Sequence, residues 1–179
     1  MGGLVARSAV HYGTQAGHAW VGKLRRIAFL GTPHHGAALE RGGNWIDLAL
    51  GASRFSAPFA RLGKIRSAGI TDLRHGNVLD EHWRDQDRFA RQRGARTALP
   101  LPADVLCCAL AASRSRPGAP RAAGDGLVSV ASALGRGHGL HELAIPADRQ
   151  WIGYAMNHME LLSRAEVAEQ LVRFFARSQ

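Results

Sequence analysis

Residues 103–113, ADVLCCALAAS, form an apolar run that ends in the polar, Pro- and Gly-rich segment 113–124, SRSRPGAPRAAG. A short apolar run bounded by turn residues predicts a buried strand followed by a loop. Cys107 and Cys108 are adjacent in this run. Adjacent strand residues point to opposite faces and cannot easily bridge each other, so we expect two buried free thiols and no disulfide.

Two further runs extend this pattern along the chain. Residues 25–33, RRIAFLGTP, predict a second buried strand that ends in a loop. Residues 140–146, LHELAIP, predict a third, weaker strand. Between and after them lie helical or loop segments, and this alternation is typical of an α/β fold with a parallel sheet of about three strands flanked by helices.

Helices are expected at both ends of the chain. Apolar spacing predicts a helix over about residues 2–15. Ser163 and Glu166 form an S-x-x-E capping box, which together with a second apolar face predicts a last helix that packs on the sheet. The expected stripe of the first helix comprises Leu4, Val5, Ser8, Ala9 and Tyr12, and that of the last comprises Val167, Leu171, Phe174 and Phe175.

The segment between the first two strands is too long for a simple crossover. It spans about residues 36–102 and contains Trp45, Phe55 and Phe59. Long insertions of this kind form binding lids or additional helical layers. We expect a mainly helical, cap-like insertion whose aromatic side chains partly face the edge of the sheet near His158.

Length and composition limit the class of protein. The 179 residues, 46% of them hydrophobic, suit a single globular domain spanning residues 1–179. The net charge of +9 suggests acidic partners, but Lys23 and Lys64 are the only lysines and the arginines are scattered. We therefore expect no nucleic-acid partner. No apolar run approaches 18 residues, so no transmembrane segment is expected either.

Two polar residues occupy positions suited to catalysis. Asp125 lies between two glycines beyond the predicted strand 103–113, and His158 follows the third predicted strand in the segment NHMELLS. Carboxyl ends of parallel strands meet at one edge of the sheet, where α/β proteins place their sites. An acid that orients a histidine and a histidine that removes a proton are two parts of a nucleophilic triad. We expect these side chains to lie within hydrogen-bonding distance.

The third part of a triad is not recognisable within the sequence. A nucleophile elbow reads Gly-x-Ser-x-Gly, and the chain contains no such pentapeptide. Ser8, Ser53, Ser132 and Ser163 lack the flanking glycines of an elbow. If a serine preceded Met1, Met1 and Gly2 would complete the pentapeptide, and the glycines at 2 and 3 would allow close helix packing. We therefore expect the nucleophile to lie upstream of Met1.

Four segments together carry a family resemblance: MGGLVARSA, FLGTPHHGAALERGGNWID, GDGLVSVASALG and NHMELLSRAEV. In this order they resemble the C-terminal half of an α/β-hydrolase of the lipase and GPI-inositol-deacylase-like group. The resemblance covers most of the chain apart from the insertion. It implies that Asp125 is the triad acid, that His158 is the base, and that the N–H of Met1 lines the oxyanion hole.

The resemblance further implies an ester hydrolase that acts on a small-molecule or lipid-like ester without a cofactor. Neither His34 with His35 nor His138 with His141 has a carboxylate or cysteine partner at metal-ligand spacing, so no metal is expected. A second interpretation is a non-catalytic hydrolase remnant or binding module without the nucleophile. A nucleic-acid binder is a third, less favoured interpretation.

Overall fold

The computed structural model describes residues 2–36, 78–79, 99–120, 122–137 and 139–176. Within these ranges the elements are, in chain order, α1 (Gly2–Gln15), the 3-10 helix η1 (Val21–Lys23), β1 (Arg26–Leu30), β2 (Leu106–Ser113), α5 (Val130–Ala133), the 3-10 helices η4 (Gly139–His141) and η5 (Ala147–Arg149), β3 (Gln150–Tyr154), the 3-10 helix η6 (Met159–Leu162) and α6 (Ala165–Ala176).

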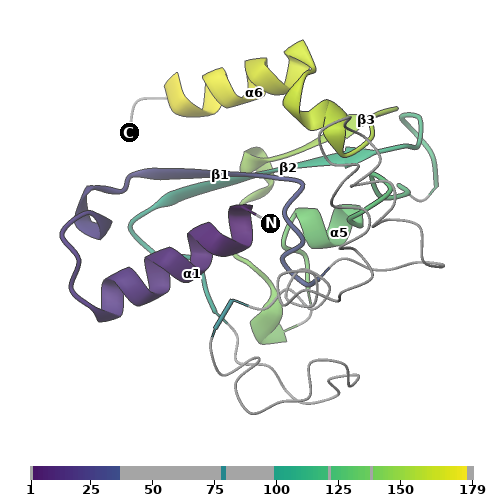
Figure 1. Ribbon diagram of the computed structural model, residues 1–179. Coiled ribbons are helices and arrows are strands. Elements are labelled where there is room, and N and C mark those ends of the chain that lie inside the picture. Colours follow the sequence, from purple (N-terminus) through teal and green to yellow (C-terminus); the bar gives the residue numbers. More distant parts are fainter. Residues whose placement is uncertain (1, 37–77, 80–98, 121, 138, 177–179) are drawn as a thin grey trace, which may run out of the picture.

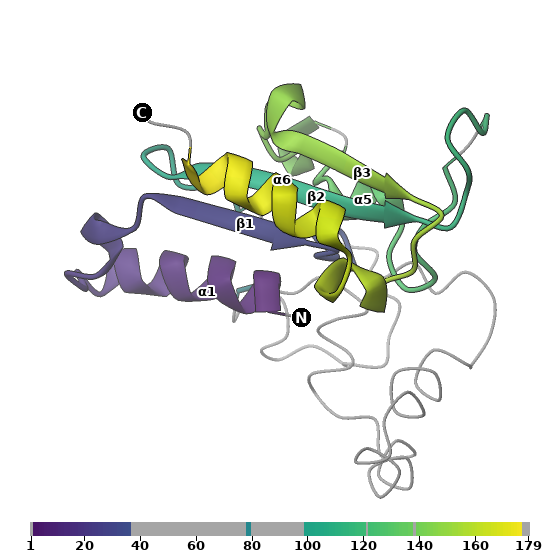
Figure 2. The same ribbon diagram turned by 90° about the horizontal axis from the view of Figure 1, so that it is seen from above.

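The three described strands form one parallel sheet in the order β1-β2-β3. Ala28 of β1 is in register with Cys108, and Ala112 of β2 is in register with Gly153. All three strands end at the same edge of the sheet, and α1 begins near that edge and runs back along β1 (Figure 2). The predicted parallel α/β arrangement is therefore confirmed.

Helices lie on both faces of this sheet (Figure 1). Cys108 and Leu110 of β2 pack with Val167 and Phe174 of α6 on one face. On the other face, where α1 and α5 lie in Figure 1, Cys107 belongs to a separate apolar cluster. Both cysteines are buried and free, as the alternation of strand side chains predicted.

The predicted third strand is wrong in position. Residues 140–146 form no strand, and β3 instead covers Gln150–Tyr154. Leu143 and Ile145 are nevertheless buried in the core, which they reach from an irregular segment. The apolar residues of this segment therefore indicated that it is buried, but not that it pairs with a neighbouring strand.

Both predicted terminal helices form, but their buried stripes differ from the expected ones. In α1 the buried positions are Leu4, Arg7, Val10 and Gly13, while Val5 is 60% exposed. In α6, Val167 and Phe174 are buried and Phe175 is 52% exposed. The buried strip of α1 is therefore shifted around the helix from the expected one, whereas the buried strip of α6 is narrower than expected.

Most of the insertion 36–102 lies outside the described residues, and so do Trp45, Phe55 and Phe59. Its described parts, Val78, Leu79 and Leu99, pack with Leu4 in a small apolar cluster at the start of α1. Across the described ranges, no helix combines the length and apolar character needed to cross a membrane.

Candidate active site

Asp125 and His158 are in direct contact at the carboxyl edge of the sheet. Nδ1 of His158 lies 2.7 Å from Oδ2 of Asp125, between residues 33 positions apart in the chain. The carboxylate side chain is fully buried, whereas the imidazole side chain is 27% exposed. The predicted hydrogen-bonding distance between these two side chains is therefore confirmed.

The turn around Asp125 fixes its carboxylate. Oδ1 accepts hydrogen bonds from the backbone N–H groups of Leu127, at 2.9 Å, and Val128, at 2.8 Å. The backbone N–H of Asp125 donates to the carbonyl oxygen of Val128 at 3.1 Å. Gly126 has a φ of +103°, which glycine adopts without steric cost. The Gly-Asp-Gly sequence thus builds a tight turn whose backbone aims the acid.

The chain returns to Asp125 after β3 through a short connection. Ala155 follows the strand with a φ of +50°, a left-handed conformation that is uncommon outside glycine. Met156 then donates its N–H to the carbonyl oxygen of Ser113, and His158 donates its own to that of Asp125. Asp125 and His158 are therefore linked by a backbone hydrogen bond as well as by the contact between their side chains.

Asn157 and Glu160 stabilise the segment that carries the histidine. The side-chain oxygen of Asn157 accepts the N–H groups of Met159 and Glu160, at 2.9 and 3.1 Å. Glu160 accepts the N–H of Asn157 at 2.8 Å and the guanidinium of Arg164 at 2.7 Å. The hydrogen bond from the backbone of Asn157, and then that from Arg164, lower the pKa of the partly exposed Glu160.

The contact determines which nitrogen of His158 carries a proton. An ionised carboxylate only accepts hydrogen bonds, so Nδ1 must be the donor to Asp125. In the neutral ring Nε2 then carries the lone pair. This is the tautomer that a general base requires when it removes a proton from a hydroxyl group.

The start of α1 reaches the same edge of the sheet. A methyl group at Gly3 would lie 2.1 Å from Oγ1 of Thr32, so this helix turn and the loop after β1 are in contact that only glycine allows. Gly2, by contrast, has open space around it. Met1, the expected oxyanion donor, lies outside the described residues.

The loop after β1 is held by α5 on one side and by α1 on the other. The hydroxyl of Ser132 donates to the carbonyl oxygen of Gly36 at 2.9 Å and accepts the N–H of His35 at 3.1 Å. Arg7 approaches Nδ1 of His34 at 3.4 Å and donates to the carbonyl oxygen of Leu99. The sequence did not predict these roles of Arg7 and Ser132, because both side chains act through hydrogen bonds to the backbone of residues far away in the chain.

Burial dominates the electrostatics of this cluster. It lowers the pKa of Arg7 to about 10, which leaves the guanidinium charged at neutral pH. Burial, then the charge of Arg7 and then His35, lower the pKa of His34 to about 3, so that this imidazole is neutral. His34 is therefore a buried, uncharged imidazole next to the Arg7 cation.

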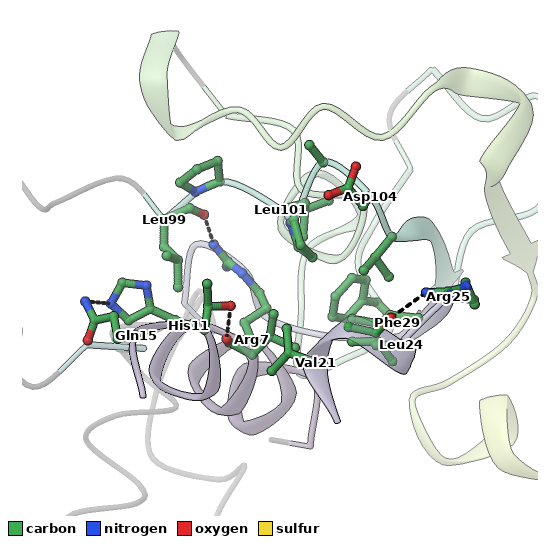
Figure 3. A pocket seen from close by; sticks show the side chains of 18 residues that line it. Arg7, His11, Gln15, Val21, Leu24, Arg25, Phe29, Leu99, Leu101 and Asp104 are labelled. Carbon is green, nitrogen blue, oxygen red and sulfur yellow. Dashed lines mark hydrogen bonds between the residues drawn. The ribbon is translucent and has the colours of Figure 1, made fainter. Parts of the chain in front are cut away.

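A separate cavity of about 760 Å³ lies between α1, β1 and the segment 99–105. Figure 3 shows Arg7 on its wall, reaching toward Leu99, with the mainly apolar side chains of Val21, Leu24 and Phe29 nearby. Neither Asp125 nor His158 lines this cavity. It is therefore not part of the candidate active site.

The described residues contain no group of three His, Cys, Asp or Glu side chains that could hold a metal ion. Asp125 and His158 together form an oriented acid–base pair at the edge of the sheet.

Comparison of the chain with protein-family models, with curated proteins and with solved structures gave no match.

Proposed function

We propose that the chain is the C-terminal part of an α/β-hydrolase that cleaves carboxylic esters through a Ser-Asp-His triad. The Asp125–His158 contact carries this proposal, because a buried carboxylate on Nδ1 prepares the opposite ring nitrogen to accept a proton. The order of acid and histidine along the chain also matches that of α/β-hydrolases.

The proposed nucleophile is a serine that precedes Met1. Such a serine would stand at the start of α1, which begins near the carboxyl edge of the sheet (Figure 2). His158 contacts Gly31, directly after β1, at the same edge. The close packing of Gly3 on Thr32 supports this placement, because a nucleophile elbow brings its helix tightly against the neighbouring strand. The N–H of Met1 is the proposed oxyanion donor.

The proposed reaction uses the three groups in sequence. Nε2 of His158 takes the serine proton while the serine oxygen bonds to the ester carbonyl carbon. The same nitrogen then gives that proton to the departing alcohol as the acyl–oxygen bond breaks. Water, deprotonated by His158, then attacks the acyl carbon, the bond between the acyl group and the serine oxygen breaks, and His158 returns the proton to the serine oxygen. Asp125 stabilises the imidazolium in both steps. The proposed substrate class is small-molecule or lipid-like esters, and the reaction needs no cofactor.

A fluorophosphonate probe tests the assignment of the nucleophile. The protein is expressed from its gene together with the in-frame codons upstream of Met1, labelled, and mapped by mass spectrometry. The proposal predicts one labelled serine, in a Gly-x-Ser segment directly before Met1. An in-frame stop codon there, or a folded protein without label, would instead favour a non-catalytic binding module.

A further inference from the structure

Gly31 lies close against the imidazole of His158. It is the first residue after β1, its φ is +54°, and its N–H donates to the carbonyl oxygen of Leu110 at 2.8 Å. A methyl group built on Gly31 would lie 2.8 Å from Cε1 and 3.0 Å from Nδ1 of His158. Atoms of real side chains do not approach so closely, so the ring occupies the space that any side chain at position 31 would need.

The contact falls on the end of the ring that bonds to Asp125. Nδ1 is both the atom that donates to Oδ2 and one of the atoms nearest to Gly31. The same methyl group would also lie 2.8 Å from Cδ1 of Leu161, which is 3% exposed. A side chain at position 31 would therefore have to displace the imidazole, and Leu161, which is itself buried, occupies part of the same space.

From these contacts we propose that Gly31 is a positioning residue for His158. Because it has no Cβ, Gly31 leaves the space that the ring needs when Nδ1 contacts Oδ2 of Asp125. The inference rests on the proposed function, in which that bond selects the catalytic tautomer. Gly31 itself touches no reacting atom.

The backbone conformation of Gly31 could by itself require glycine, and the chain offers a control for that effect. Gly17 has a φ of +65°, and a methyl group there would meet nothing within 4 Å. Alanine at either position meets the same kind of backbone strain. Only at position 31 does it also meet the histidine.

The experiment compares Gly31→Ala with Gly17→Ala in the 179-residue chain by nuclear magnetic resonance of the His158 ring. The readouts are the downfield Nδ1 proton and the ¹⁵N shifts that distinguish the two tautomers, and neither needs catalytic activity. We expect Gly17→Ala to keep the wild-type signals. Gly31→Ala should lose the Nδ1 proton signal and should show a mixture of tautomers.

Asparagine variants provide a second pair, because asparagine tolerates left-handed backbone better than alanine does. Gly31→Asn should disturb the histidine signals in the same way, whereas Gly17→Asn should not. Unchanged signals in a folded Gly31 variant would overturn the inference, as would unfolding of both Gly31 variants while both Gly17 variants fold. Absence of the Nδ1 signal from the wild-type chain would instead contradict the acid–base pair on which the proposed function rests.

Discussion

Oδ2 of Asp125 lies 2.7 Å from Nδ1 of His158, and Oδ1 of the same carboxylate accepts two backbone N–H groups. One oxygen of the Asp125 carboxylate thus stabilises the turn, and the other binds the histidine. Substitutions at Asp125 can separate these two roles.

Asp125→Asn should preserve the fold and reverse the tautomer of His158. The amide oxygen can still accept from Leu127 and Val128, which turns the NH₂ group toward the imidazole. Nδ1 must then accept, and the ring proton moves to Nε2. The ¹⁵N shifts of the neutral ring measure this directly. A variant whose Nδ1 remains protonated would contradict the hydrogen-bond assignment.

Asp125→Ala should destabilise the protein, because the N–H groups of Leu127 and Val128 lose their acceptor. Each unsatisfied donor costs about 1–3 kcal/mol, and one of the two is buried and the other partly buried, so we expect a total loss of about 2–6 kcal/mol in the free energy of unfolding. Urea unfolding measures it. Asp104→Ala, at an exposed position, is the matched control and should change this free energy by less than about 0.5 kcal/mol. Equal effects at both positions would disprove the structural role of Oδ1.

His34 should make stability depend on pH in the acidic range. Its pKa in the folded protein is lowered to about 3 from an ordinary value of 6.5, so the unfolded chain binds more protons between these values. The contribution of His34 to the free energy of unfolding is therefore fully present above about pH 6.5. It is lost as the pH decreases toward 3, by up to about 1.4 kcal/mol per pH unit. Urea unfolding at several pH values measures this slope.

His34→Gln should remove this contribution, since glutamine does not titrate. His18→Gln is the control, because His18 is exposed. If the wild-type protein and the His34→Gln variant lose stability in parallel from pH 6.5 to 4, the buried neutral state assigned to His34 is wrong.

Cys107 and Cys108 should be unreactive in the folded protein. Burial raises the pKa of Cys107 to about 11 and that of Cys108 to about 12, and each residue is only 3% exposed. The thiolate is the reactive form, and access is also blocked. A thiol-disulfide reagent at pH 8 should find no reactive thiol before unfolding and two after it. Fast reaction of either cysteine with the native protein would contradict their placement in the sheet.

The sequence predicted the elements whose signals are local. The apolar run 103–113 contains β2, and the opposite burial of Cys107 and Cys108 follows from strand alternation alone. β3 was missed because QWIGY is short and mixes polar, aromatic and glycine residues. It is a strand because β2 pairs with it, which is a non-local cause.

The candidate site shows the same limit. Asp125 and His158 could be predicted because their residue types and chain order are chemically distinctive. Gly31 and Ser132 could not, because they act through the space and the backbone bonds that they offer to distant residues. The burial of Arg7 could not be predicted either, because the apolar pattern of a helix places charged residues on its exposed side.

The central claim is that Asp125 and His158 activate a serine that precedes Met1, and ester hydrolysis tests it most directly. The protein extended upstream through the expected Gly-x-Ser and its preceding strands is assayed with a p-nitrophenyl ester, beside its His158→Ala variant and the 179-residue chain. We predict turnover by the extended protein, a loss of at least about 10³-fold in kcat on His158→Ala, and background rates for the short chain. Undiminished turnover in the extended His158→Ala variant would contradict the claim, and so would robust turnover by the short chain that His158→Ala abolishes.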